Sequence, residues 1–102
     1  MSNPLTSVIT KYLESKYNAY VINLIQASKS GNADLLACIQ GQFYCFELKY
    51  GKDTVKDLQI AKINKVILAG GKGGIVKNTD DIDNIINNPP KLLNYNVNVI
   101  NL

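Results

Sequence analysis

The 102-residue sequence contains no histidine. This absence excludes zinc sites with histidine ligands, Ser-His-Asp triads and Cys-His proteases. Any catalysis must therefore use carboxylates, lysines, amides or hydroxyls. The two cysteines, Cys38 and Cys45, are too few for a disulfide framework. Both lie in apolar runs, where a thiol usually packs as a small hydrophobic group.

Long apolar runs are also missing, and no segment approaches the roughly 20 residues that span a bilayer. The N-terminal MSNPLTSVITK has no basic segment followed by a long apolar run, so it does not resemble a secretory signal. We therefore expect a cytoplasmic protein with no membrane-inserted part. The abundance of Asn, Ile and Lys is typical of an AT-rich or viral genome, such as that of a phage.

The length predicts a single domain over 1–102, with a core at about 4–88 and a C-terminal tail at 89–102 of unknown role. So small a domain would gain stability as a dimer. The composition, 46% hydrophobic and 19% charged, is that of a globular chain. The net charge of +3 favours an anionic partner but is too small to indicate nucleic-acid binding by itself.

Hydrophobic periodicity and turn residues predict an α/β fold. Asn3 before Pro4 is a plausible N-cap for the first helix. The hairpin signal is Gln40-Gly41 between two apolar runs, and because these runs are apolar on both faces, we expect a sheet covered on both sides. The expected elements in order are a helix at 4–17, a strand at 19–26, the hairpin DLLACI and FYCFELK, a helix at 54–69 opened by Thr54 and Asp57, a strand GIVK at 74–77 and a helix TDDIDNIIN at 79–87. The tail could be an extra strand, a dimer arm or a loose end.

The hairpin is expected to bring three charged side chains to one face of the sheet. If Gln40 and Gly41 are the two turn residues, Asp34 lies directly opposite Glu47. Facing carboxylates destabilise a sheet, and burying them costs several kcal/mol unless they are paired. A divalent cation removes both penalties, and oxygen ligands select Mg²⁺ or Mn²⁺. Lys49 lies one position along on the same face, so the set has the parts for metal-assisted phosphodiester hydrolysis.

Two alternatives depend on the same residues. A three-residue turn would put the two carboxylates on different faces, and Glu47 with Lys49 could be an ordinary surface pair while Asp34 caps a loop. Gln59 bears on the choice because it lies on the apolar stripe of the second helix, where a buried amide needs a partner. It could bond to backbone in the core, or lie at the edge of the acidic cluster and orient a water or a phosphate.

The ordered set of motifs resembles the PD-(D/E)XK nucleases, and within them the small VRR-NUC and Holliday-junction-resolvase type. The matching stretches are SGNAD, giving Gly31-x-x-Asp34, then FELK at 46–49, DLQ at 57–59 and the ILAGGKGGIVKNTDDIDNII segment. The resemblance covers about 4–88. It implies a restriction-endonuclease-like core, with a central mixed sheet flanked by helices in the order α-β-β-β-α-β-α. Because so small a chain has little surface for gripping a duplex, we also expect a homodimer.

The resemblance also implies roles for individual residues. Asp34, Glu47 and the backbone carbonyl of Leu48 would hold Mg²⁺, for which Mn²⁺ could substitute. Lys49 would position or deprotonate the attacking water, and Gln59 would help to fix it. Cleavage of DNA would leave a 5′-phosphate and a 3′-hydroxyl, and a branched or junction substrate is expected. Candidate phosphate contacts are Ser28, Lys29, Ser30, Gly31 and Lys52.

Other readings stay open. Many members of the family carry a glutamate early in the first helix, where this sequence offers Asn3, Thr6 and Ser7. The alternative function is therefore a catalytically inactive DNA-binding or assembly module on the same fold. A third is a small binding protein in which the acidic pair is structural. The segment GGKGG lacks the spacing of a phosphate-binding loop and precedes a strand, so we interpret it as a turn.

Overall fold

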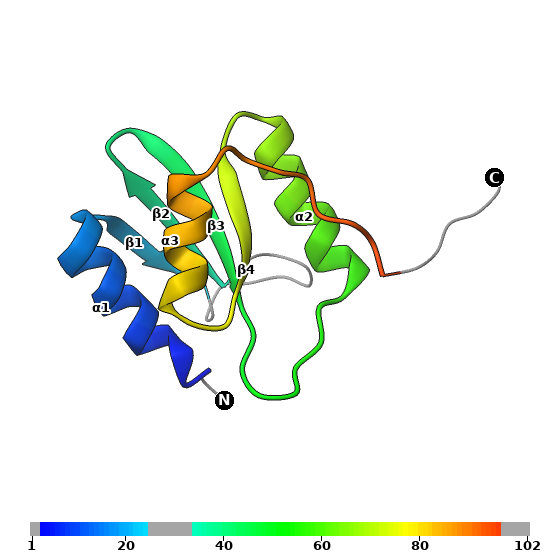
Figure 1. The fold of residues 1–102 in the computed structure, drawn as a ribbon, viewed down its shortest axis with the longest axis horizontal. Helices are drawn as coiled ribbons and strands as arrows, with labels where there is room; N and C mark the ends of the chain where they lie inside the picture. Colours follow the sequence, from blue (N-terminus) through cyan, green and yellow to red (C-terminus); the bar gives the residue numbers. More distant parts are fainter. Residues whose placement is uncertain (1–2, 25–33, 97–102) are drawn as a thin grey trace, which may run out of the picture.

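The computed structural model describes residues 3–24 and 34–96. These residues form seven elements in the predicted order (Figure 1). They are α1 (Leu5–Tyr17), β1 (Tyr20–Asn23), β2 (Leu35–Ile39), β3 (Gln42–Leu48), α2 (Asp57–Leu68), β4 (Lys72–Val76) and α3 (Thr79–Asn87). The prediction of an α/β fold is confirmed, and α3 has the predicted bounds.

The sheet has the strand order β1-β2-β3-β4. The first three strands run antiparallel, and β4 pairs with β3 in parallel after the chain has crossed over through α2. The sheet is therefore mixed, as predicted. Because the parallel pair requires a long connection, α2 is the element that closes the fold over this part of the sheet.

The β2–β3 hairpin has the predicted two-residue turn. Gln40 and Gly41 both have positive φ angles, of 49° and 82°, as the tight turns favoured in hairpins require. Leu35 pairs with Phe46, and the backbone N–H of Asp34 donates to the carbonyl of Phe46 at 3.1 Å. The register that sets Asp34 against Glu47 is thus confirmed.

Helices lie on both faces of the sheet. Ile9 and Leu13 of α1 and Ile82 of α3 are buried in one core cluster with residues of β2 and β3, whereas Ile63 of α2 packs with Cys45 on the other side. Figure 1 shows α1 and α3 along one side and α2 apart from them.

The expectation of a sheet covered on both sides, made from the two hairpin strands, is wrong for part of one face. Cys38 of β2 and Phe43 of β3 are exposed there, and so is the neighbouring β1. Tyr20 and Ile22 are 70% and 44% exposed, and the strand pairing places them on the same face as Cys45. The reason is the position of α2, which packs on β3 and β4, while β1 lies at the far edge of the sheet.

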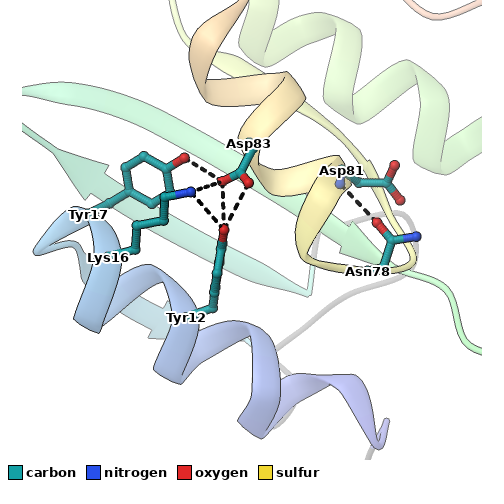
Figure 2. Close-up of polar contacts among 6 residues, drawn as sticks. All are labelled: Tyr12, Lys16, Tyr17, Asn78, Asp81 and Asp83. Carbon is teal, nitrogen blue, oxygen red and sulfur yellow. Dashed lines mark hydrogen bonds and ion pairs between the residues drawn. The ribbon is translucent and has the colours of Figure 1, made fainter.

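Helices α1 and α3 are joined by a polar cluster around Asp83 (Figure 2). The Asp83 carboxylate accepts hydrogen bonds from the hydroxyls of Tyr12 and Tyr17, and Lys16 Nζ lies 3.2 Å from Oδ1. The hydrogen bond from Tyr17 is the main reason why the pKa of Asp83 is below its usual value. This cluster holds the two helices of one layer together.

Two boundaries differ from the predictions. Helix α2 begins at Asp57 rather than near residue 54, because the Gln59 side chain accepts from the backbone N–H of Lys56 and caps the helix there. Strand β4 begins at Lys72 rather than at residue 74, so part of GGKGG is strand and not turn. A Cβ on Gly73 would lie 2.5 Å from Cys45 Sγ, and this close approach explains the glycine.

Residues 89–96, here called the C-terminal strap, run along α2 (Figure 1). Asn64 on α2 donates to the carbonyl of Leu93 at 3.0 Å and accepts from its N–H at 2.8 Å. Asn96 donates from its backbone N–H to Asp57 Oδ1 and from its side-chain amide to the carbonyl of Val55. The strap contains no strand. None of the helices in the described ranges is long and apolar enough to cross a membrane.

Candidate active site

The candidate site lies at the carboxyl end of β3, on the face that carries α2. Glu47 is the penultimate residue of β3, Asp34 immediately precedes β2 and Lys49 immediately follows β3. The hairpin register brings Asp34 beside Glu47, and α2 brings Gln59 to the same carboxylate. The structure therefore gathers all four residues for which the sequence predicted catalytic roles.

The two oxygens of the Glu47 carboxylate have different surroundings. Oε2 accepts a 2.8 Å hydrogen bond from Gln59 Nε2 and lies 3.5 Å from Lys49 Nζ. Oε1 is buried and has no hydrogen-bond partner among the described residues. A buried carboxylate oxygen without a partner is costly, so this atom is the expected ligand position for a cation.

Burial is the main reason why the pKa of Glu47 rises to about 7. The charge of Asp34 raises the pKa further, and the Lys49 ammonium opposes both effects. Glu47 is only 2% exposed and Lys49 is 9% exposed, so water screens their interaction weakly. The carboxylate pair thus carries more negative charge than one lysine neutralises.

Leu48 lies between Glu47 and Lys49, and both its backbone N–H and its carbonyl oxygen are hydrogen-bonded to side chains. Its N–H donates to Asp34 Oδ2 at 2.9 Å, and its carbonyl oxygen accepts from Asn3 Nδ2 at 2.9 Å. The carbonyl predicted as a metal ligand is therefore already hydrogen-bonded. A carbonyl oxygen has two lone pairs, so this bond leaves one available for a cation.

A cavity of about 390 Å³ opens at the acidic pair. Asp34, Glu47, Lys49 and the Leu48 backbone line it together with Asn3 and Asp53. In the part of the chain that the structure describes, no third acidic or thiol side chain joins Asp34 and Glu47 in a metal-binding group. A cation bound here would therefore depend on two carboxylates, the Leu48 carbonyl and water.

Gln59 has a different set of contacts from the one predicted. Its amide nitrogen donates to Glu47 and its amide oxygen accepts from Lys56, so both polar atoms of the carboxamide bond to protein. It lies at the edge of the acidic pair, as the sequence predicted. Its contacts orient the Glu47 carboxylate and do not reach into the cavity.

Most of the residues predicted to contact phosphate lie outside the ranges that the structure describes. Ser28, Lys29, Ser30 and Gly31 lie outside the described residues. Lys52 is exposed in the turn after β3, near the same end of the sheet as the cavity. Sequence reasoning missed Asn3 and Asp53 as lining residues. Only for Asn3 was there a signal, because it occupies the region where the PD-(D/E)XK pattern carries an early glutamate.

Solved structures include a protein of the same architecture, described as a VRR_NUC domain. The two structures superpose with a TM-score of 0.60 over 79% of this chain and 92% of that chain, at 20% sequence identity. The fold is that of a VRR_NUC domain. At this identity the likeness establishes the fold alone. It agrees with the sequence resemblance to the VRR-NUC type that we described from the motifs. No family model matches the sequence, and no curated protein matches it.

Proposed function

We propose that this protein is a metal-dependent endonuclease that hydrolyses phosphodiester bonds of DNA. The observation that carries the proposal is Glu47 Oε1, a buried carboxylate oxygen with no hydrogen-bond partner among residues 3–24 and 34–96, set beside Asp34 at a cavity on a VRR_NUC fold. A purely structural acidic pair would be expected to satisfy both carboxylates within the protein.

The residues present fit a hard divalent cation. Asp34, Glu47 and the Leu48 carbonyl offer only oxygen ligands, which favour Mg²⁺ or Mn²⁺ over zinc. Burial and the charge of Asp34 raise the pKa of Glu47, so a cation at this site would stabilise its ionised form. When bound, such an ion polarises a phosphoryl oxygen and makes a bound water more acidic.

The side chains of the protein supply the remaining parts of the reaction. Lys49 extends into the cavity from the end of β3, where its ammonium can hold the attacking water and offset charge on the phosphoryl oxygens. Gln59 keeps the Glu47 carboxylate in one orientation through its 2.8 Å hydrogen bond. We therefore assign Lys49 a catalytic role and Gln59 a positioning role.

DNA is the proposed substrate, and a branched or junction form of it is the proposed preference. Lys52 is exposed near the cavity and is suited to a backbone phosphate. A 102-residue chain has little surface for gripping a duplex, so we propose that two copies act together. A two-fold pair would set two scissile phosphates at a fixed spacing.

Cleavage assays on defined substrates test this function. Wild type, Lys49→Ala and Glu47→Ala are incubated with end-labelled four-way junction, flap and duplex DNA, each with Mg²⁺, Mn²⁺ or EDTA. Matched controls are Lys11→Ala and Glu14→Ala, which remove the same charges from exposed positions on α1. We expect cutting that needs metal, survives both control substitutions and falls at least about 100-fold in both site variants. Salt-sensitive DNA binding without cutting would instead support an inactive binding module.

A further inference from the structure

Asn3, which directly precedes Pro4 and α1, reaches the candidate site on β3. Asn3 Nδ2 donates a 2.9 Å hydrogen bond to the carbonyl oxygen of Leu48, across 45 positions of sequence. Asn3 also lines the site cavity with Asp34 and Glu47. Its side chain is therefore part of the surroundings of the acidic pair, although it precedes the first helix.

The other end of the same carboxamide is anchored in α1. Asn3 Oδ1 accepts from the backbone N–H of Leu5 at 2.9 Å, and the Asn3 carbonyl accepts from the N–H of Thr6 at 3.0 Å. These bonds satisfy free N–H groups of the first helical turn. A carboxamide held at its oxygen has little freedom at its nitrogen, so the hydrogen bond to Leu48 is preorganised.

The consequence concerns the backbone of Leu48, between Glu47 and Lys49. Asp34 holds the N–H of Leu48 and Asn3 holds its carbonyl oxygen. The N–H of Lys49, in the same peptide group as that carbonyl, donates to the carbonyl of Val76 at 2.9 Å. The carbonyl direction decides whether its second lone pair is available at the acidic pair. Groups that orient metal ligands in this way typically change metal affinity by about 10–100-fold when they are removed.

We propose that Asn3 is a positioning residue for the metal site, acting through the Leu48 carbonyl. This inference rests on the proposed function, since it requires that a divalent cation binds at Asp34 and Glu47. Asn3 would then have two roles. It caps the first turn of α1, and it fixes the Leu48 carbonyl, 45 residues later in the chain, as a metal ligand.

The test separates the two tasks of Asn3. In Asn3→Ser the hydroxyl oxygen can still accept from the first turn of α1, as serine does at helix starts, but the side chain is too short to reach Leu48. Asn94→Ser makes the same exchange at an exposed position of the C-terminal strap and is the matched control. Mn²⁺ affinity is measured by calorimetry and by the loss of free-Mn²⁺ paramagnetic resonance signal, at a temperature where circular dichroism shows every variant folded.

We expect Asn3→Ser to weaken Mn²⁺ binding by about 10-fold or more, with Asn94→Ser unchanged. Equal affinity of Asn3→Ser and wild type would overturn the inference and leave the proposed function standing. Tighter binding by Asn3→Ser would also overturn it, because the amide would then compete with the cation for the carbonyl. If wild type and Glu47→Ala bind Mn²⁺ equally weakly, the proposed metal site itself is wrong.

Discussion

Gln59 Nε2 donates a 2.8 Å hydrogen bond to Oε2 of Glu47, while Oε1 of the same carboxylate is buried and has no hydrogen-bond partner in the part of the chain that the structure describes. The helix thus fixes one oxygen of the carboxylate, while the other oxygen bonds to none of the described residues. This asymmetry supports the proposed cation site, and it leads to predictions about the protein without any nucleic acid.

Divalent metal should stabilise the folded protein through Glu47. A ligand at about 100 times its dissociation constant adds about 2.7 kcal/mol to the free energy of unfolding, which for a domain of this size raises the melting temperature by about 10 °C or more. We expect Mn²⁺ to produce this increase in wild type and in Glu14→Gln, but not in Glu47→Gln. Differential scanning calorimetry with and without Mn²⁺ measures it. An equal increase in Glu47→Gln would place the metal elsewhere.

Glu47 should also make the stability of the metal-free protein depend on pH. Its pKa is raised from 4.5 to about 7 in the folded state, so between these values the folded protein holds a proton that the unfolded chain has released. The free energy of unfolding therefore falls as pH rises from about 4.5 to about 7, and changes little through this group above that range. In Glu47→Gln this decrease should disappear. Urea titrations at pH 5, 6, 7 and 8 on both proteins measure the difference.

Metal binding should follow the opposite trend with pH. The cation requires the ionised carboxylate, so its affinity should increase as pH rises through about 7 and Glu47 loses its proton. Mn²⁺ titrations at the same four pH values test this directly. An affinity that is constant between pH 5 and 8 would show that Glu47 does not ligate the ion.

The hairpin shows how much of the site the sequence could predict. Gln40-Gly41 fixed the turn, and because side chains in strands alternate with a period of two, the turn determined that Asp34 faces Glu47. The position of Gln59 followed from helical periodicity in the same way. Local patterns of this kind need no knowledge of the rest of the fold.

The contacts that the sequence could not predict join distant segments. Nothing in the pattern around Asn3 indicates a hydrogen bond to Leu48, and nothing in α2 indicates that Asn64 holds the strap. The exposure of Tyr20 was also missed, because β-branched and aromatic residues suit an open edge strand as well as a covered one. These features depend on where whole elements pack.

Gly73 should be intolerant of any side chain. A Cβ there would lie 2.5 Å from Cys45 Sγ and 2.7 Å from the Cys45 carbonyl oxygen, which belongs to the neighbouring strand and cannot move freely. We expect Gly73→Ala to cost about 3 kcal/mol of unfolding free energy. Gly74→Ala meets only the flexible Ile85 side chain and should cost about 1 kcal/mol. Urea unfolding of the two variants gives the comparison, and a reversed order would contradict the packing described for β4.

The C-terminal strap should be held to α2 mainly by Asn64. This side chain is 9% exposed and makes two hydrogen bonds to the backbone of Leu93, of 3.0 and 2.8 Å. Asn64→Ala removes both and leaves the partly buried polar groups of Leu93 unpaired, so it should lower the unfolding free energy by about 2 kcal/mol. Asn94→Ala, at an exposed position one residue further along, should change it by less than about 0.5 kcal/mol.

Hydrogen exchange distinguishes a released strap from a general loss of stability. In Asn64→Ala we expect the Leu93 amide to lose its protection well before the amides of β3, because the strap would detach while the sheet stays folded. In wild type the Leu93 amide donates to Asn64 Oδ1 and should exchange slowly. If Leu93 and β3 lost protection together in Asn64→Ala, the strap would be an integral part of the core, and its attachment could not be separated from the folding of α2.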